Sequence, residues 1–345
     1  MDTAPLRSLA AALSGKTVAV VGDLVADEFV YGRVARVSRE APVLILEYDT
    51  TEIVAGGAGN AANNVAALGG RPALVALAGT DDVGRRLVAS LHPRVDRSGI
   101  QRLRARTPVK TRILAGGIHS AKQQVVRIDR ASTYAVTRAV RTAFERAALD
   151  RCEAADAVLI SDYGSGLVTP AFAARIRTQL RRSGHPVPVL VDTRYQLLAY
   201  HGLTACTPNE SEVEAALGIE IDDDPVTLER AGRAILERTG MDAVLITRGS
   251  RGMALFVTGA RTVHIPIVGS DEVADVTGAG DTVMATMTLA LAAGGSFAAA
   301  ARLANYAGGL VVMKRGTATV SADELQQALG ASTAGAAARL RPAGR

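Results

Sequence analysis

The sequence predicts an α/β protein with a mostly parallel sheet, covered by helices on both faces, and a small second sheet. Short continuous apolar runs alternate with amphipathic stretches of helical length along most of the chain. Continuous apolar runs are typical of strands that are buried on both faces. Strands that alternate with helices favour a three-layer α/β/α arrangement. Two segments without helical periodicity interrupt this pattern and predict the small sheet.

The strands of the main sheet are expected at the apolar runs, and the helices at the amphipathic stretches between them. The runs are Val18–Val21, Ala73–Ala78, Ala157–Ile160, Val187–Val191 and Val244–Thr247. The clearest helical patterns are Val136–Leu149, Ala171–Arg182 and Val226–Thr239. Residues 1–16 lack the long apolar core of a signal peptide, so we expect a surface helix there.

The two interrupting segments, residues 30–53 and 107–129, predict strand excursions that leave the main sheet and return. Both are rich in β-branched residues and contain turn glycines. If the excursions pair with each other, they form a lid made of strands. We expect residues 1–330 to form one domain. The Ala-, Gly- and Arg-rich residues 331–345 are expected to be a disordered tail.

The composition excludes several classes of function. Two cysteines exclude a disulfide framework and a four-thiolate zinc site, and five scattered histidines argue against a histidine-rich metal site. The net charge of +5 is compatible with an anionic small ligand. Because the chain has no tryptophan and few other aromatic residues, we expect no nucleic-acid binding. No apolar stretch is long enough to span a bilayer, so we expect a cytoplasmic protein with no membrane partner.

The segment DVTGAGD at residues 275–281, followed by the helical run Thr282–Ala293, indicates phosphoryl-transfer chemistry. A loop of small residues that opens a helix leaves backbone N–H groups free to bind an anion. A carboxylate there repels phosphate, but it is useful if it removes a proton from an attacking hydroxyl. Asp281 is therefore the predicted general base, and Gly278, Ala279 and Gly280 supply the N–H groups. A simple helix cap after a glycine turn is the alternative.

Three motifs together resemble the ribokinase-like (PfkB) carbohydrate kinases. DVTGAGD is similar to the family's D-T-x-G-A-G-D, GGAGN at 56–60 to its Gly-Gly turn before an asparagine-bearing helix, and NESE at 209–212 to its N-x-x-E. The motifs follow the family's order, and the likeness runs from about Val18 to about Leu325. The resemblance implies the three-layer fold with a lid, ATP and Mg²⁺ as cofactors, K⁺ as a further candidate, and a sugar or sugar phosphate as substrate.

The resemblance also implies roles for individual residues. The sugar would contact Asp27, Gly56, Gly57 and Asn60. The nucleotide would contact Asn209, Thr247, Gly249, Gly252 and Asn305. Mg²⁺ would be held, partly through water, by Asn209 and Glu212, and Asp275 is a candidate ligand of a monovalent cation. The alternatives are a turn or helix cap at Asp27, a capping box for Asn209 and Glu212, and an interior polar contact for Asn305.

Four further stretches resemble the D-β-D-heptose 7-phosphate kinases of this family. They are YGRVARVSREAPV at 31–43, QQVVRID at 123–129, SDYGSG at 161–166 and KRGTATV at 314–320. This likeness implies that Asp162 belongs to the substrate site. A phosphorylated sugar needs cations, and the lid segments supply Arg36, Lys110 and Arg112, although a solvated basic strand face is the alternative. Arg39, Leu44, Ser165 and the segment DTR at 192–194 depart from the pattern and leave the exact sugar open.

The function expected from the sequence is transfer of the ATP γ-phosphate to the anomeric hydroxyl of heptose 7-phosphate. A kinase for fructose, ribose or a nucleoside is the alternative, and a non-catalytic regulator that binds sugar or nucleotide is an alternative of another class. Many such kinases carry a fused nucleotidyltransferase domain, and we expect that activity on another protein here. A homodimer joined through the lid is expected, because lid strands expose edges and apolar side chains such as Val43, Ile45 and Val125.

Overall fold

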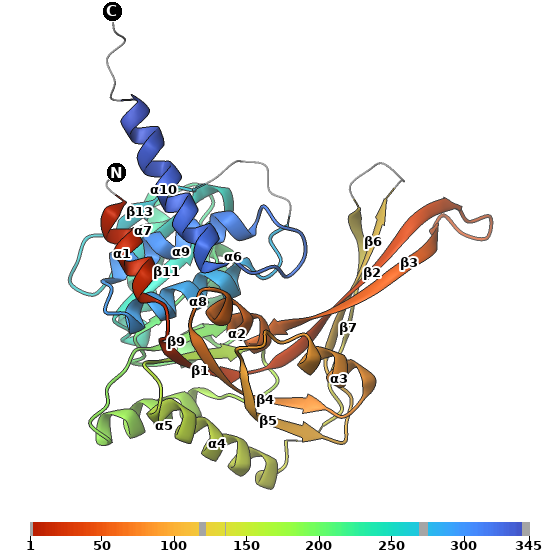
Figure 1. The fold of residues 1–345 in the computed structure, drawn as a ribbon, viewed down its shortest axis with the longest axis horizontal. Coiled ribbons are helices and arrows are strands. Elements are labelled where there is room, and N and C mark those ends of the chain that lie inside the picture. The colour runs from red at the N-terminus through yellow and green to blue at the C-terminus, as the bar shows by residue number, and fades with distance from the viewer. Residues whose placement is uncertain (1–2, 117–121, 135, 269–274, 340–345) are drawn as a thin grey trace, which may run out of the picture.

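The computed structural model describes residues 3–116, 122–134, 136–268 and 275–339, and shows a layered α/β/α body with a small sheet at one end (Figure 1). Nine strands of these residues form the main sheet, in the order β13-β12-β11-β10-β9-β8-β1-β4-β5. Neighbours are parallel except at β11/β12 and β12/β13. The strands are β1 (Thr17–Gly22), β4 (Arg71–Gly79), β5 (Asp96–Leu103), β8 (Ala157–Asp162), β9 (Val189–Thr193), β10 (Ala205–Cys206), β11 (Ala243–Thr247), β12 (Met253–Val257) and β13 (Val263–Ile265).

Helices cover both faces of this sheet. One core, which includes Val18 and Val20 of β1, packs against α1 (Ala4–Ala12), α2 (Ala58–Ala67), α3 (Asp82–Ala89), α8 (Ala279–Ala292), α9 (Phe297–Val311) and α10 (Ala322–Arg339). The other core, which includes Ala19 and Val21, packs against α4 (Arg138–Glu153), α5 (Pro170–Arg182), α6 (Glu210–Leu217) and α7 (Pro225–Thr239). Successive residues of β1 thus enter opposite cores, which explains its continuous apolar run. The predicted fold class is confirmed.

Local signals set the ends of the helices. Thr169 and Asp224 cap α5 and α7 with their side chains, and a proline follows each of them. The last helix, α10, continues to Arg339 and so extends into residues 331–345, the predicted disordered tail. Alanine, the strongest helix former, is frequent in that stretch; residues 340–345 lie outside the described part. Among the described residues, no helix is both long and apolar enough to cross a bilayer.

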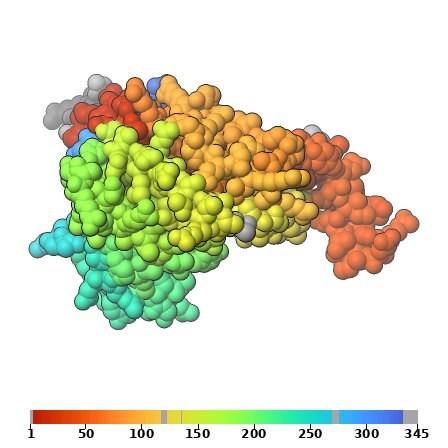
Figure 2. Space-filling model, turned by 90° about the horizontal axis from the view of Figure 1, so that it is seen from below, coloured from red at the N-terminus to blue at the C-terminus, as the bar shows by residue number. Residues whose placement is uncertain are grey.

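The smaller sheet is the predicted lid, and its order is β3-β2-β6-β7. Its strands are β2 (Leu24–Val37), β3 (Leu44–Gly57), β6 (Val109–Gly116) and β7 (Gln123–Arg130). The two excursions pair through the parallel neighbours β2 and β6. Figure 2 shows the outer part of β2 and β3, in orange-red, standing away from the main body. The inner part of β2 is buried, but Val37 and Val43 at the outer end are 60% and 56% exposed.

The strand β1 marks the point where the sheet grows in two directions, with β4 on one side and β8 on the other. In open α/β sheets, ligands bind outside the carboxyl ends of the strands at such a switch point. Here β1 ends at Gly22 and β8 at Asp162. The lid strand β2 begins at Leu24, so the lid stands beside this crevice. The topology therefore predicts the place of the functional site.

The close approach of β1 and β8 at the crevice requires a glycine at position 22. A Cβ atom there would lie 2.0 Å from the carbonyl oxygen of Ser161. We expect Gly22→Ala to lower the free energy of unfolding by about 1–3 kcal/mol, a usual cost of overpacking. Gly330→Ala in α10, where nothing lies within 4 Å, serves as the control and should stabilise slightly. Urea unfolding measures both, and a Gly22→Ala protein as stable as the wild type would contradict this packing.

Candidate active site

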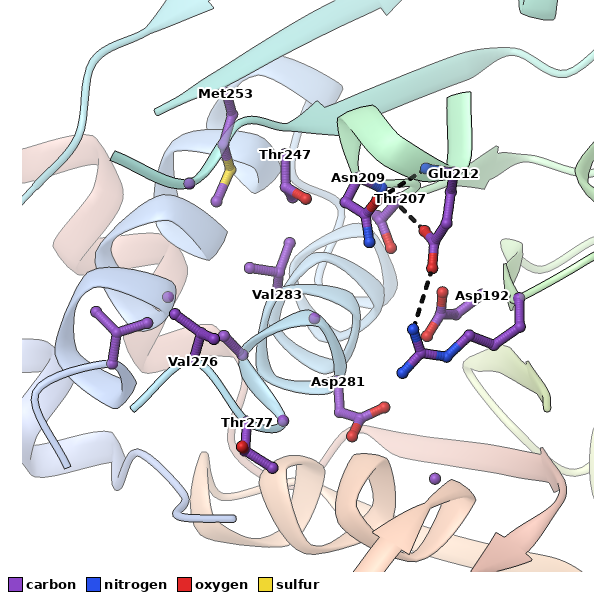
Figure 3. Close-up of a pocket in the computed structure, with 18 of the residues that line it drawn as sticks. Asp192, Thr207, Asn209, Glu212, Thr247, Met253, Val276, Thr277, Asp281 and Val283 are labelled. Atoms are coloured by element: carbon purple, nitrogen blue, oxygen red, sulfur yellow. Dashed lines mark hydrogen bonds and ion pairs between the residues drawn. The ribbon is translucent and has the colours of Figure 1, made fainter. Parts of the chain in front are cut away.

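A pocket of about 610 Å³ opens at the carboxyl ends of the central strands, between the main body and the lid. Most of the residues predicted from the sequence line it. These are Asp27, Gly57, Lys110, Arg112, Asn209, Glu212, Thr247, Gly249, Gly252, Gly278, Ala279, Gly280, Asp281 and Asn305. In Figure 3, Asp281, Asp192 and Glu212 lie on one side of the pocket, and Met253, Val276 and Val283 lie on the other. The pocket thus has an acidic side and an apolar side.

The amino end of α8 supplies the anion-binding groups of the pocket. Gly278, with a φ of +78°, precedes the helix, and no side chain caps the first turn. A Cβ atom at Gly278 would lie 2.6 Å from the Asn60 amide nitrogen, so only glycine fits this contact. The Ala279 N–H donates to the Val276 carbonyl at 3.2 Å. The other N–H groups at the start of the helix face no capping side chain, and the helix dipole favours a negatively charged ligand there.

Asp281 is buried in the first turn of α8, and two donors hold its carboxylate. Asn60 Nδ2 donates to Oδ2 at 2.7 Å, and the Tyr163 hydroxyl donates to Oδ1 at 3.3 Å. Asn64 donates to the Asn60 Oδ1 atom at 3.1 Å, and Thr282 donates to Asn64 at 2.9 Å. This network joins α2 to α8 and fixes the direction of the carboxylate.

On the acidic side of the pocket, the carboxyl groups of Asp281 and Asp192 are costly to ionise. Burial is the main cause that raises the pKa of Asp281 to about 6, and the nearby Asp27 raises it further, while the bonds from Asn60 and Tyr163 oppose the shift. Burial also raises the pKa of Asp192 to about 8, together with the charges of Asp281 and Glu212. A carboxyl with a pKa near neutrality can accept a proton and release it again at ordinary pH, as a general base must.

The lid supplies a carboxylate and two cations beside Asp281. Asp27 on β2 forms an ion pair with Arg112 on β6. Lys110, also on β6, has its Nζ atom 4.6 Å from the centre of the Tyr163 ring. Among the described residues, Lys110 makes no ion pair with a carboxylate. Burial and the neighbouring Arg194 lower its pKa, so an anion in the pocket would stabilise its charged form.

On the opposite wall of the pocket, Asn209 and Glu212 cap a helix. Asn209 and Glu212 form a capping box at the start of α6, with bonds of 2.9 and 3.0 Å. The Glu212 Oε1 atom lies 3.7 Å from the Nη1 atom of Arg194. Thr247 at the end of β11 pairs with Asn209 through a parallel bridge. The capping box weighed from the sequence is thus present, and both of its residues also line the pocket.

Five predicted site residues do not line the pocket. Asn60 uses its amide on Asp281 and Asn64, and Gly56 leaves the space that the Asp27 carboxylate fills. Asp162 is buried beneath the pocket, where Gly164, Thr193 and Tyr200 donate to it. Asp275 accepts bonds from the backbone of Thr277 and Gly316, and Arg36 lies exposed at the outer end of β2. Asp162 and Arg36 thus do not line this pocket, and their roles as substrate contacts stay predictions.

Tyr163, Asp192 and Arg194 are among the polar residues of the pocket that were not predicted as site residues. Tyr163 follows β8, Asp192 lies in β9, and Arg194 follows β9. The rule that ligands lie at the carboxyl ends of parallel strands could have identified them. Asn305, which was weighed as an interior contact, lines the pocket and also donates to the Pro266 carbonyl at 2.8 Å.

Comparison with known proteins places the chain in a family. The model of the pfkB family carbohydrate kinases matches residues 16–324. The chain belongs to this family and is a carbohydrate kinase, which confirms the membership expected from the three motifs.

The curated relatives are longer than this chain. It is 41% identical over 337 residues to the bifunctional protein HldE of Geobacter sulfurreducens, and 42% identical over 334 residues to that of Caulobacter vibrioides. These matches cover 96% and 94% of this chain, but 66% and 65% of the relatives. The chain therefore spans about two thirds of the length of these relatives.

Solved structures share the fold at low sequence identity. The Arabidopsis thaliana ribokinase complexed with ribose and ATP has a TM-score of 0.69 at 20% identity, and the match covers 91% of this chain and 99% of that one. The Escherichia coli phosphofructokinase-2 in complex with substrates and products has a TM-score of 0.70 at 17% identity, with 92% and 99% covered. These likenesses support the fold class.

The raised pKa of Asp281 predicts how Asp281→Asn changes stability with pH. Folding raises this pKa from 3.8 to about 6, so the folded chain holds the proton more tightly than the unfolded chain. The wild type therefore loses stability as pH rises through that interval, and the uncharged asparagine variant does not. Relative to the wild type, Asp281→Asn should gain about 1–3 kcal/mol between about pH 4 and pH 7. Urea unfolding measures this, and a difference that stays constant with pH would contradict the pKa.

Proposed function

We propose that this kinase transfers the γ-phosphoryl group of ATP to the anomeric hydroxyl of D-glycero-β-D-manno-heptose 7-phosphate, which yields the 1,7-bisphosphate. One observation carries the proposal: a single pocket contains the buried carboxylate of Asp281, the amino end of α8, which can bind an anion, and the lid cations Lys110 and Arg112. The likeness of four stretches to heptose 7-phosphate kinases supports this sugar. Lys110, with no carboxylate partner among the described residues, favours a phosphorylated sugar over fructose, ribose or a nucleoside.

In the proposed mechanism, Asp281 takes the proton from the sugar hydroxyl as the hydroxyl oxygen bonds to the γ-phosphorus. The bond from that phosphorus to the β,γ-bridging oxygen breaks, and ADP leaves. The N–H groups of Gly278 and Gly280 at the start of α8 stabilise the charge on the transferred group, whereas the Ala279 N–H is bonded to the Val276 carbonyl. Asn60 acts on Asp281 and keeps its carboxylate aimed at the hydroxyl. Asp27 accepts bonds from other hydroxyls of the sugar, and Gly57 lets the sugar approach the backbone.

ATP would lie along the opposite wall of the pocket. Thr247, Gly249 and Gly252 would contact its phosphates, and the apolar side with Met253, Val276 and Val283 suits the adenine, next to Asn305. Mg²⁺ keeps water ligands and prefers oxygen, so the Glu212 carboxylate and the Asn209 amide oxygen suit it, partly through water. Bound there, Mg²⁺ would neutralise phosphate charge. A K⁺ ion near Asp275 remains a prediction.

The assignment of Asp281 predicts a severe loss of activity in Asp281→Asn. The variant keeps the shape of the side chain but cannot take a proton, so kcat should fall about 10³-fold or more. Asp82→Asn, the same change in the exposed first turn of α3, is the control and should keep normal activity. Coupled measurement of ADP release tests both variants. If Asp281→Asn keeps a tenth of the wild-type kcat, Asp281 is not the base.

The proposed substrate predicts a preference that depends on Lys110. Charge-assisted contacts contribute about 1.5–3 kcal/mol, so Lys110→Ala should lower kcat/KM for heptose 7-phosphate about 10- to 100-fold and affect unphosphorylated heptose little. Lys122→Ala is the control, since Lys122 lies on the lid beside Asp49 and outside the pocket. The preference should weaken as salt rises. If Lys110→Ala lowers kcat/KM equally for both sugars, Lys110 does not bind the distal phosphate.

We also propose that two copies of the chain pair through the lid. The outer lid exposes Val34, Val37, Val43, Leu44, Val125, Val126 and Ile128, whereas Ile45 is half-buried. Exposed apolar side chains gathered on one small sheet usually need a partner. Light scattering at micromolar concentration should give the mass of a dimer, and Val43→Asp combined with Val125→Asp should give a monomer. A monomeric wild type would contradict the proposal.

A further inference from the structure

Tyr163 contacts the candidate base, and although it lies in the stretch SDYGSG at 161–166, it was not predicted as a site residue. Its hydroxyl lies 3.3 Å from the Oδ1 atom of Asp281, and the Asn60 amide binds the other carboxylate oxygen. Burial and the Asp281 charge keep the pKa of Tyr163 well above 10, so the phenol remains protonated and can donate. Each carboxylate oxygen of Asp281 thus has its own donor.

The loop that carries Tyr163 is anchored to the end of β1. The backbone N–H of Tyr163 donates to Asp23 Oδ2 at 2.8 Å, and the hydroxyl of Ser165 donates to Asp23 Oδ1. Asp23 is buried at the switch point of the sheet. A Cβ atom on Gly57 would lie 3.4 Å from the Tyr163 ring, so the ring also packs closely on the turn before α2. These contacts give Tyr163 a fixed position relative to the sheet.

The ring of Tyr163 also holds two cations of the pocket. The Lys110 Nζ atom lies 4.6 Å from the ring centre, and the Arg194 Cζ atom lies 5.3 Å from it. Lys110 comes from the lid and Arg194 from the end of β9. An aromatic ring attracts cations at such distances. The same side chain thus contacts the base and orders cations from two parts of the chain.

We propose that Tyr163 is a positioning residue for phosphoryl transfer, whose hydroxyl orients Asp281 and whose ring holds Lys110 for the substrate phosphate. The inference rests on the proposed function, in which Asp281 is the base and Lys110 binds the distal phosphate. Tyr163 itself transfers no proton in this role. Its contribution acts through the two side chains that it contacts.

The two contacts of Tyr163 predict two separable effects. The charged groups that face Asp281 are Asp27, Asp192 and Arg194, and Tyr163→Phe leaves them in place. The change removes a bond that favours the charged carboxylate, so the pKa of Asp281 should rise. The acidic limb of the pH profile of kcat/KM should therefore shift to higher pH by about half a pH unit to one pH unit. KM should change little. Tyr163→Leu also removes the ring and should raise KM for the phosphosugar about tenfold.

Tyr200→Phe is the matched control. The Tyr200 hydroxyl also donates to a buried carboxylate, that of Asp162, but it lies outside the pocket. This variant should be less stable than the wild type, but the acidic limb of its pH profile of kcat/KM should not move. Because the substrate phosphate titrates equally in every assay, a difference between variants reports the enzyme. If Tyr163→Phe does not fold, 3-fluorotyrosine at position 163, a stronger donor of nearly the same shape, should move the limb down.

The outcomes separate this inference from the proposed function. An acid limb that stays in place in Tyr163→Phe, or with 3-fluorotyrosine, overturns the positioning role even when Asp281→Asn is inactive. A limb that moves equally in Tyr200→Phe also overturns it, because a general loss of rigidity would then explain the shift. If Asp281→Asn retains activity, the proposed base is wrong, and the role of Tyr163 fails with it.

Discussion

The hydrogen bond from Asn60 to Asp281 connects the parts of the molecule on which the pocket depends. Asn60 lies in α2, directly after the lid strand β3, and Asp281 lies in the first turn of α8. The approach of the two helices leaves no room for a Cβ atom at Gly278, so α8 starts with a glycine, which has no side chain to cap the first turn. One contact between helices thus aims the carboxylate and shapes the anion site beside it.

Burial of Asp281 brings an electrostatic cost that the surrounding residues partly offset. Asp27 and Asp192 oppose its charge, whereas Asn60, Tyr163 and Arg194 favour it, and the balance leaves its pKa near 6. The lid contributes Asp27, which it holds in an ion pair with Arg112, and presents Lys110 without a carboxylate partner among the described residues. An anionic substrate between Lys110 and α8 would complete the pairing of charges. The lid therefore contributes to the chemistry as well as to enclosure.

The sequence predicts the fold because burial on both faces of β1 demands an apolar run, and it predicts the lid because the helical period is lost there. Asp281, Asn209 and Glu212 are predictable since each lies in a local motif at a helix start. Other positions depend on tertiary structure. Whether Arg36 reaches the pocket depends on how far β2 extends. At the end of β8, Tyr163 lines the pocket, whereas Asp162, one residue earlier, is buried against Tyr200. Sequence spacing alone does not distinguish such neighbours.

The central claim is that a buried, hydrogen-bonded Asp281 is poised near neutral pH, and its titration tests this most directly. Carbon-13 NMR of aspartate side-chain carboxyls, compared with Asp281→Asn to assign the signal, follows that single group. We expect the signal to titrate at about 6, and to titrate higher in Asn60→Ala, which lacks the stronger donor. A signal that titrates near the ordinary value of 3.8, or one that Asn60→Ala leaves unchanged, would contradict the account.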